Sequence, residues 1–218
     1  MKFTEIEISE LLKASKDTLY QLIISGAFIV VIGLILGFIL FFTEDKSSKG
    51  IVKVLHRIVS LIVDIARSIP FVILMVILIP LTIILVGTML GAKAALPALI
   101  ISASPFYARV VYMSLRDVDK GKIEALKSMG ASNITIVVYL AKEALPSLIS
   151  GITVTLVTLV GFIASAGAIG AGGLGDLAVR KAFANDYKMA YVSVFLVLII
   201  VFIIQILGDY LSKKIDKR

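Results

Sequence analysis

Residues 19–42 read LYQLIISGAFIVVIGLILGFILFF, a run of the chain without a single charged side chain. A helix needs about 20 predominantly apolar residues to cross the roughly 30 Å of hydrocarbon in a bilayer. The run is long enough, and it exceeds the apolar stretch of about 7–15 residues that a cleaved signal peptide contains. It therefore predicts a membrane-spanning helix.

Four further apolar stretches follow at residues 68–92, 94–115, 147–172 and 189–208. Arg109 is the only charged residue in them, and it lies close enough to a helix end for its side chain to reach the membrane surface. We therefore expect an all-α integral membrane protein with about five transmembrane helices, built as one transmembrane domain over residues 1–218.

The composition supports a membrane protein and excludes several other classes. Hydrophobic residues make up 59% of the chain and charged residues 17%, whereas soluble domains hold about 25% charged residues. With no cysteine and one histidine, disulfide frameworks and most metal sites are excluded. We expect no catalytic residue and no metal. We also expect no nucleic-acid partner, because the basic residues lie in short segments between apolar runs.

The basic residues predict the orientation of the chain. The second, fourth and sixth segments outside the apolar runs hold twice as many lysines and arginines as the first, third and fifth. Because such residues concentrate on the cytoplasmic side, the N-terminus is expected outside and the C-terminus inside. Residues 1–16 predict a short amphipathic helix on the outer surface, with a frayed terminus as the alternative.

The polar segment 116–146 is large enough to contact a soluble partner. Ile123, Leu126 and Met129 recur at helical spacing, and Gly130 is placed to end that short helix in a left-handed turn. Ser132 or Asn133 can then cap a second short helix over residues 134–139. Such a helix–glycine–helix elbow can seat in a groove on a partner. The alternative is an amphipathic loop on the membrane surface.

The same segment resembles the "EAA" loop of ABC-importer permeases, which docks on the ATPase subunit. The resemblance rests on Glu124-Ala125-Leu126, Gly130 and Leu145-Pro146. Leu126 replaces the second alanine of the pattern, and the Leu-Pro pair comes three residues later than usual. The resemblance implies that the docking loop contains Glu124, Ala125, Met129, Gly130, Ala131, Leu145 and Pro146.

The resemblance extends over nearly the whole chain, through residues 67–71, 105–109, 143–146, 158–161 and 170–175. It is strongest to methionine-importer permeases and weaker to osmoprotectant and phosphonate permeases. It implies the type I ABC-importer permease fold in a bacterial cytoplasmic membrane, with methionine as substrate. The partners implied are two cytoplasmic ABC ATPase subunits and an extracytoplasmic binding protein. The chain has no Walker A motif, so ATP and magnesium belong to the ATPase and no cofactor is expected here.

A second copy of the chain is a further expected partner, because five helices are too few to enclose a polar path and cover their own outer faces. Gly161, Phe162, Ser165 and Gly167 lie on a stretch rich in small residues that suits a translocation path, a gate or a subunit contact. Packing inside the bundle is the alternative.

Two other features are ambiguous in the sequence. Gly170, Gly172 and Gly175 match the dinucleotide fingerprint, but they end a membrane run, so we expect close helix packing or a bend instead. Asp64 and Arg67 are three residues apart, which predicts a structural ion pair near the membrane surface, with a proton or substrate site as the alternative.

His56 is expected to be an ordinary solvated side chain in a basic segment. Two functions from other classes compete with an ABC permease. A small secondary transporter usually contains buried acids at mid-membrane and two repeated halves. The cores of the five apolar runs contain no acid, and an odd number of helices argues against two equal halves. A membrane scaffold that transports nothing stays open.

Overall fold

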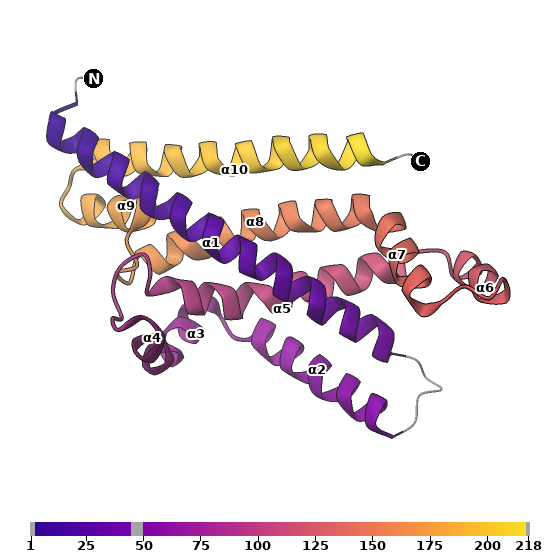
Figure 1. The fold of residues 1–218 in the computed structure, drawn as a ribbon. Coiled ribbons are helices and arrows are strands. Elements are labelled where there is room, and N and C mark those ends of the chain that lie inside the picture. Colours follow the sequence, from indigo (N-terminus) through magenta and orange to yellow (C-terminus); the bar gives the residue numbers. More distant parts are fainter. Residues whose placement is uncertain (1–2, 45–49, 217–218) are drawn as a thin grey trace.

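The computed structural model describes residues 3–44 and 50–216, and all regular structure in these ranges is helical (Figure 1). The helices are α1 (Glu5–Thr43), α2 (Ile51–Ser68), α3 (Phe71–Ile77), α4 (Ile79–Val86), α5 (Ala95–Arg116), α6 (Lys120–Ser128), α7 (Asn133–Glu143), α8 (Leu145–Gly167), α9 (Gly173–Phe183) and α10 (Tyr187–Ile215).

Four of these helices, α1, α5, α8 and α10, are long and apolar enough to cross a bilayer. Helices α2 and α3 are long and apolar enough only as a pair, with a bend of 108° between them, and this pair is the candidate for a fifth span. In Figure 1, α1 lies obliquely across α5 and α8, while α2 and α10 lie at opposite edges. This arrangement confirms the expected all-α membrane fold with about five spans.

The apolar stretch 68–92 does not form the single helix expected from its composition. Ser68 ends α2, α3 begins after Pro70, and α4 carries Pro80 in its first turn. Proline lacks an amide hydrogen and disfavours helical backbone in the residue before it, so each proline begins a new helix. Gly87 then ends α4 in a left-handed conformation. The broken span therefore starts with α2, which the sequence analysis assigned to a connecting segment.

The other spans differ from the expected ranges mainly at their ends. α5 begins and ends within one residue of the expected 94–115. α8 stops at Gly167, before the glycine-rich turn, and α10 continues to Ile215.

α1 continues without a break from Glu5 into the apolar run, so the expected separate surface helix over residues 1–16 is wrong. Thr4 caps the start of α1: its hydroxyl accepts from the Glu7 amide at 3.3 Å, and its own amide donates to the Glu7 carboxylate at 2.7 Å. Lys188 Nζ lies 3.0 Å from Glu7 Oε1 and joins this end of α1 to α10. Residues 1–2 lie outside the described ranges.

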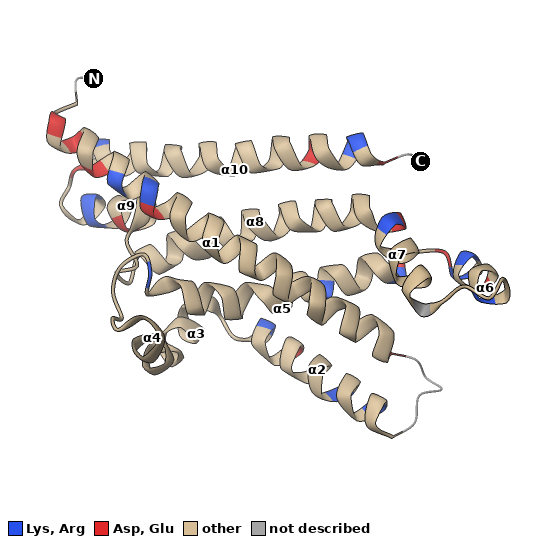
Figure 2. Ribbon diagram, in the orientation of Figure 1, with Lys and Arg blue, Asp and Glu red and all other residues tan. Residues whose placement is uncertain are grey.

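The two ends of the bundle carry different parts of the chain. The N-terminal end of α1 lies beside α9 and the start of α10 (Figures 1 and 2). At the opposite end, Ser212 Oγ near the end of α10 donates to the Pro146 carbonyl oxygen at 3.1 Å, and α6 and α7 project there. The charges used to predict orientation include Lys46, Lys49, Lys217 and Arg218, which lie outside the described residues.

The glycine-rich stretch 170–175 forms the turn from α8 into α9. Gln21 Nε2 donates to the Ala171 carbonyl at 2.8 Å, and Thr18 Oγ1 accepts from the Leu174 amide at 2.8 Å, so α1 holds the turn. A dinucleotide site requires a strand before the glycine-rich turn, and the described part of the chain has none there. A Cβ on Gly175 would lie 2.4 Å from the Ala164 carbonyl oxygen, which confirms the expected close packing.

The bundle is held together at the crossing of α1 and α5. A Cβ on Gly33 would lie 2.6 Å from the Tyr107 ring, and one on Gly37 would lie 2.5 Å from Val111 Cβ. Small residues let two helices approach closely in a membrane, where contact replaces the hydrophobic driving force. Tyr107 and Val111 are completely buried at this crossing.

We expect Gly37→Val to lower the thermal unfolding midpoint of the detergent-solubilised protein. The added side chain overlaps Val111 and the Ala108 carbonyl oxygen, and overpacking of this kind costs about 1–3 kcal/mol. Ala27→Val, on the exposed side of the same helix, is the matched control. Equal midpoints for the two variants would show that the crossing is not closely packed.

Candidate docking elbow and translocation face

The elbow turns at Gly130, directly after α6. The Gly130 amide donates to the Lys127 carbonyl and the Ala131 amide to the Leu126 carbonyl, each at 3.0 Å. This pair of hydrogen bonds is the Schellman arrangement, and it requires a left-handed residue at the turn. Gly130 supplies it with a φ of +76°. The predicted helix stop is therefore confirmed.

α7 connects the elbow to the transmembrane core. Ser132, the first of the two predicted caps, accepts from the Thr135 amide at 3.2 Å. α7 then extends to Glu143, beyond the expected end at residue 139. Ile136 and Leu140 are buried in the same apolar cluster as residues of α5 and α8. α7 is therefore packed into the same apolar core as two spanning helices.

An ion pair fixes α6 against the far end of α7. Lys122 Nζ lies 2.7 Å from Glu143 Oε1. The hydrogen bond that Lys122 donates to the Glu143 carboxylate raises the pKa of Lys122 above its ordinary value. With Gly130 and Ser132, this contact makes the elbow one preorganised unit.

The outer surface of the elbow combines apolar side chains with an unpaired acid. Met129 is 82% exposed and Ile134 is 76% exposed. Glu124 is also exposed and forms no ion pair among the described residues, although Lys120 and Lys127 lie on the same helix. Exposed apolar groups around an available charge are typical of a docking surface.

The predicted docking residues divide into two groups. Glu124, Ala125, Met129 and Gly130 lie on the exposed part of the elbow, with Ala131 half-buried behind it. Leu145 and Pro146 are in the first turn of α8, away from the tip. There the Pro146 carbonyl oxygen accepts a hydrogen bond from the Ser212 hydroxyl, and this bond positions α8 against α10.

The structure also separates the four predicted path residues. Gly161 and Ser165 are exposed and continue a stripe at helical spacing with Val154 and Thr158.

The other two of these residues lie elsewhere. The Phe162 ring stacks on Phe71 of α3, with centroids 4.7 Å apart and the rings 8° from parallel. Gly167 is buried against the start of α9, where a Cβ would lie 2.3 Å from the Asp176 amide nitrogen. Gly167 is therefore a packing residue, and Phe71 is a neighbour that the sequence analysis missed.

The predicted ion pair between Asp64 and Arg67 is not formed. Asp64 accepts from Ser60 Oγ at 3.3 Å, and the Arg67 guanidinium lies 5.9 Å from the Phe106 ring centroid. His56 is not simply solvated, because its Nδ1 lies 3.1 Å from Thr43 Oγ1 and links α2 to the end of α1.

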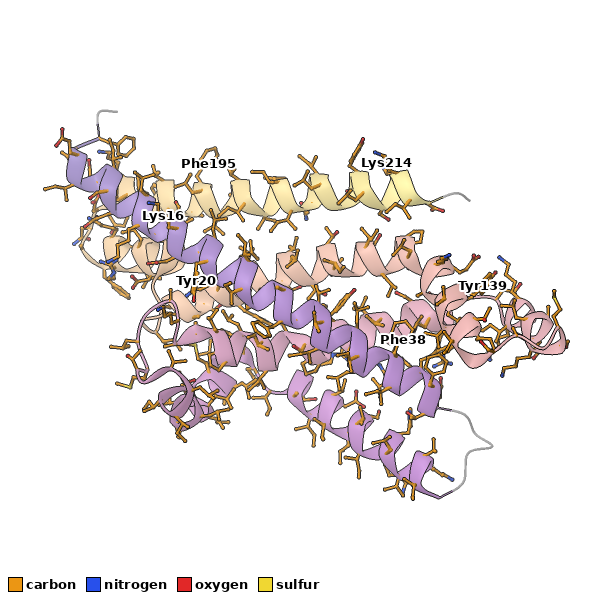
Figure 3. All side chains as sticks on the ribbon, in the orientation of Figure 1. Lys16, Tyr20, Phe38, Tyr139, Phe195 and Lys214 are labelled. Carbon is orange, nitrogen blue, oxygen red and sulfur yellow. The ribbon has the colours of Figure 1, made fainter. Side chains whose placement is uncertain are left out.

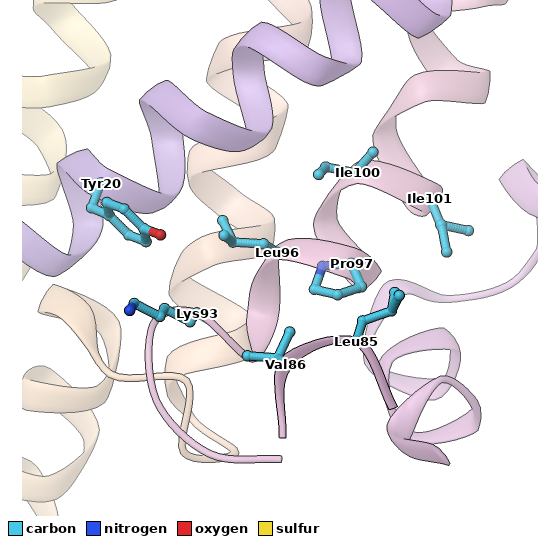
Figure 4. A pocket seen from close by; sticks show the side chains of 8 residues that line it. All are labelled: Tyr20, Leu85, Val86, Lys93, Leu96, Pro97, Ile100 and Ile101. Carbon is cyan, nitrogen blue, oxygen red and sulfur yellow. The ribbon is translucent and has the colours of Figure 1, made fainter. Parts of the chain in front are cut away.

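An open apolar pocket lies at the end of the bundle opposite the elbow, between α1, α4 and α5 (Figure 4). Tyr20 and Lys93 are the polar side chains in its lining, with Leu85, Val86 and Pro97 among the apolar ones. Its lining residues include no acid. The outward side chains of α10, such as Phe195 at 62% exposure, are also apolar and suit contact with lipid (Figure 3).

Comparison with known proteins identifies the relatives of the chain. Residues 29–218 match the family model described as binding-protein-dependent transport system inner membrane component. The chain is 50% identical to the methionine import system permease protein MetP of Bacillus subtilis, over 99% of this chain and 98% of that protein. It is 42% identical to the probable D-methionine transport system permease protein MetI of Vibrio cholerae, over 95% and 93%.

Two solved structures have the same fold. A chain of the MetNI methionine ABC transporter, solved in inward-facing conformations, superposes with a TM-score of 0.92 at 39% identity, over 99% of this chain and 100% of that one. An amino acid ABC transporter gives a TM-score of 0.69 at 19% identity, over 98% and 100%, which supports the fold alone.

We expect Gly130→Val to loosen the elbow without affecting the spans. A non-glycine residue in a left-handed turn costs about 1–2 kcal/mol, and a β-branched one is especially strained. Amide hydrogen exchange should therefore accelerate in residues 120–143 and stay unchanged in α5. Gly130→Asn is the control, since asparagine tolerates this conformation. Equal exchange in both variants would contradict the left-handed turn.

Proposed function

Because the chain belongs to the family of binding-protein-dependent transport system inner membrane components, we propose that it is the permease subunit of an ATP-driven methionine importer. The observation that carries the proposal is the ordered elbow, built on a chain that resembles methionine permeases along nearly its whole length. The elbow presents an exposed surface to a soluble partner, and its second helix is buried among spanning helices.

Two ABC ATPase subunits bind the elbows of two permease copies in this proposal. ATP and magnesium are held by the ATPase subunits, and this chain forms the translocation path as one transmembrane domain. Docking is assigned to Glu124, Ala125, Met129, Gly130 and Ala131, while Leu145 and Pro146 orient α8 behind the elbow.

A second copy and an extracytoplasmic binding protein complete the proposed assembly. The exposed stripe of α8 that includes Gly161 and Ser165 faces the second copy or the path between the copies. The stacked rings of Phe162 and Phe71 are placed to act as a gate. Gly167 is left out of the path, because it packs within its own chain.

The chain is a multi-pass protein of the bacterial cytoplasmic membrane, and we propose that its N-terminus is outside and its C-terminus cytoplasmic. Two observations support this orientation. The elbow and the C-terminal end of α10 lie at the same end of the bundle, with the N-terminus at the other (Figure 1). The segments assigned to the cytoplasm also hold most of the basic residues.

Methionine transport is tested by growth and uptake of a methionine auxotroph that lacks its other methionine importers. We expect rapid uptake of labelled methionine at limiting concentration when this chain, its ATPase and its binding protein are present. Omitting this chain alone is the control. Uptake that is equal with and without the chain would remove the assignment.

Glu124→Ala should weaken binding of the ATPase while the permease still inserts into the membrane. Loss of one member of a partly desolvated charge pair costs about 2–5 kcal/mol, whereas a helix-surface pair contributes about 0.2–0.5 kcal/mol. The ATPase retained by the purified permease should fall accordingly. Asp209→Ala, an exposed acid near the same end of the bundle, is the control. Full retention by both variants would exclude Glu124 from the interface.

A further inference from the structure

One face of α2 is polar from its first turn to its last. Its residues recur at helical spacing: Lys53, His56, Arg57, Ser60, Asp64, Arg67 and Ser68. At 100° per residue they share an arc of about 120°. Figure 2 shows the resulting row of charges along α2. A spanning helix with such a face has a polar environment on that side.

The other faces of α2 are apolar and have different neighbours. Val63 is buried in a cluster with Leu40 and Tyr112, which fixes one side of α2 against α1 and α5. Ile62 and Ile65 are 60% and 52% exposed, as expected of residues that contact lipid. α2 therefore has a protein side, a lipid side and a polar side, which adjoins the protein side at His56 and Arg67.

The charges at the end of this polar face lie level with the middle of a helix that is long and apolar enough to span a membrane. Arg67 is in contact with Phe106, the middle of α5, which has about 15 Å of helix on either side. Arg67 is therefore far from both ends of α5, whereas the sequence analysis expected it near the membrane surface. Asp64 is one turn earlier on the same face, and both side chains are exposed.

Neither charge is neutralised by an ion pair within the described chain. The Asp64 carboxylate accepts a hydrogen bond from the Ser60 hydroxyl, and the Arg67 guanidinium makes a cation–π contact with the Phe106 ring. Exposed, unpaired charges at mid-membrane are costly against lipid, so they occur where they face a water-filled cavity or another polar group. The polar face of α2 therefore lines an aqueous path or a polar interface.

We propose that Asp64 and Arg67 form a binding station for the zwitterionic amino acid in the translocation path, an inference that rests on the proposed function. The guanidinium matches the planar carboxylate of the substrate, and the Asp64 carboxylate matches its ammonium. Residues three apart on a helix have Cβ atoms about 5–6 Å apart, a spacing suited to the two charges of one α-amino acid.

The surroundings of the station suit an apolar side chain with sulfur. Phe106 lies against Arg67, and the stacked pair of Phe71 and Phe162 comes one turn further along the chain. Aromatic rings make favourable contacts with a thioether. The α2–α3 bend lies between Arg67 and Phe71, so the station and the proposed gate are four residues apart in the chain, on either side of this bend.

The access of water to the polar face of α2 is tested first. This chain contains no cysteine, so a single introduced cysteine is the only thiol that it carries. In the assembled transporter, Ser68→Cys should react rapidly with a membrane-impermeant methanethiosulfonate applied from the cytoplasmic side. Ile65→Cys, on the lipid side of the same helix, is the control and should react slowly. Added methionine should slow the reaction at position 68. Equal rates at the two positions, or no effect of methionine, would overturn the proposal.

Uptake in proteoliposomes with the binding protein tests the charges themselves. Arg67→Gln and Asp64→Asn should each lower the methionine uptake rate at least about tenfold, because each removes a charge-assisted contact. Arg67→Lys should restore part of the rate, and Arg57→Gln, on the same face but further from the gate, should stay near wild type. The amount of bound ATPase should be unchanged in every variant.

The proposed function and the binding station are contradicted by different results. A wild-type protein that does not transport methionine would overturn the proposed function. A wild-type protein that does transport it, with Arg67→Gln and Asp64→Asn at the wild-type rate, would overturn only the station.

Discussion

The architecture depends on one constraint: inside hydrocarbon, every backbone amide and carbonyl needs a partner within the protein. α1, α5, α8 and α10 meet it with uninterrupted helices. Two of the places where the chain departs from regular helix are the turn after α8 and the bend between α2 and α3. The turn after α8 is held by Gln21 and Thr18 of α1. At the α2–α3 bend the Pro70 carbonyl accepts hydrogen bonds from the Ile73 and Leu74 amides, so the first turn of α3 satisfies part of the backbone there.

The elbow is connected to the proposed path by a continuous series of contacts. The elbow is fixed internally by the turn at Gly130 and by the pair of Lys122 and Glu143. Its second helix is buried beside α5 and α8 through Ile136 and Leu140. α5 carries Phe106 beside Arg67, and α8 carries Phe162 in the stacked pair. The elbow is therefore joined to the proposed station and gate through two helices.

The sequence predicted the uninterrupted spans and the elbow well, because a long charge-free run and a capped helix–glycine–helix pattern are local signals. It predicted α2 poorly. The charges at Asp64 and Arg67 placed α2 outside the apolar runs, although their helical spacing was the available signal of an amphipathic span. The contrast between Ser165, which is exposed, and Gly167, which packs on α9, could not be read from the sequence, because it depends on where α9 folds back.

The central claim is that the uncovered faces of α2 and α8 meet a second copy of the chain around a shared path. The most direct measurement is the distance between identical spin labels on the two copies of the assembled transporter. A label at Ser165 on α8 is compared with one at Phe195 on the outward face of α10. The account predicts a distinctly shorter distance at Ser165 than at Phe195. An equal or longer distance at Ser165, or no coupling at either position, would contradict it.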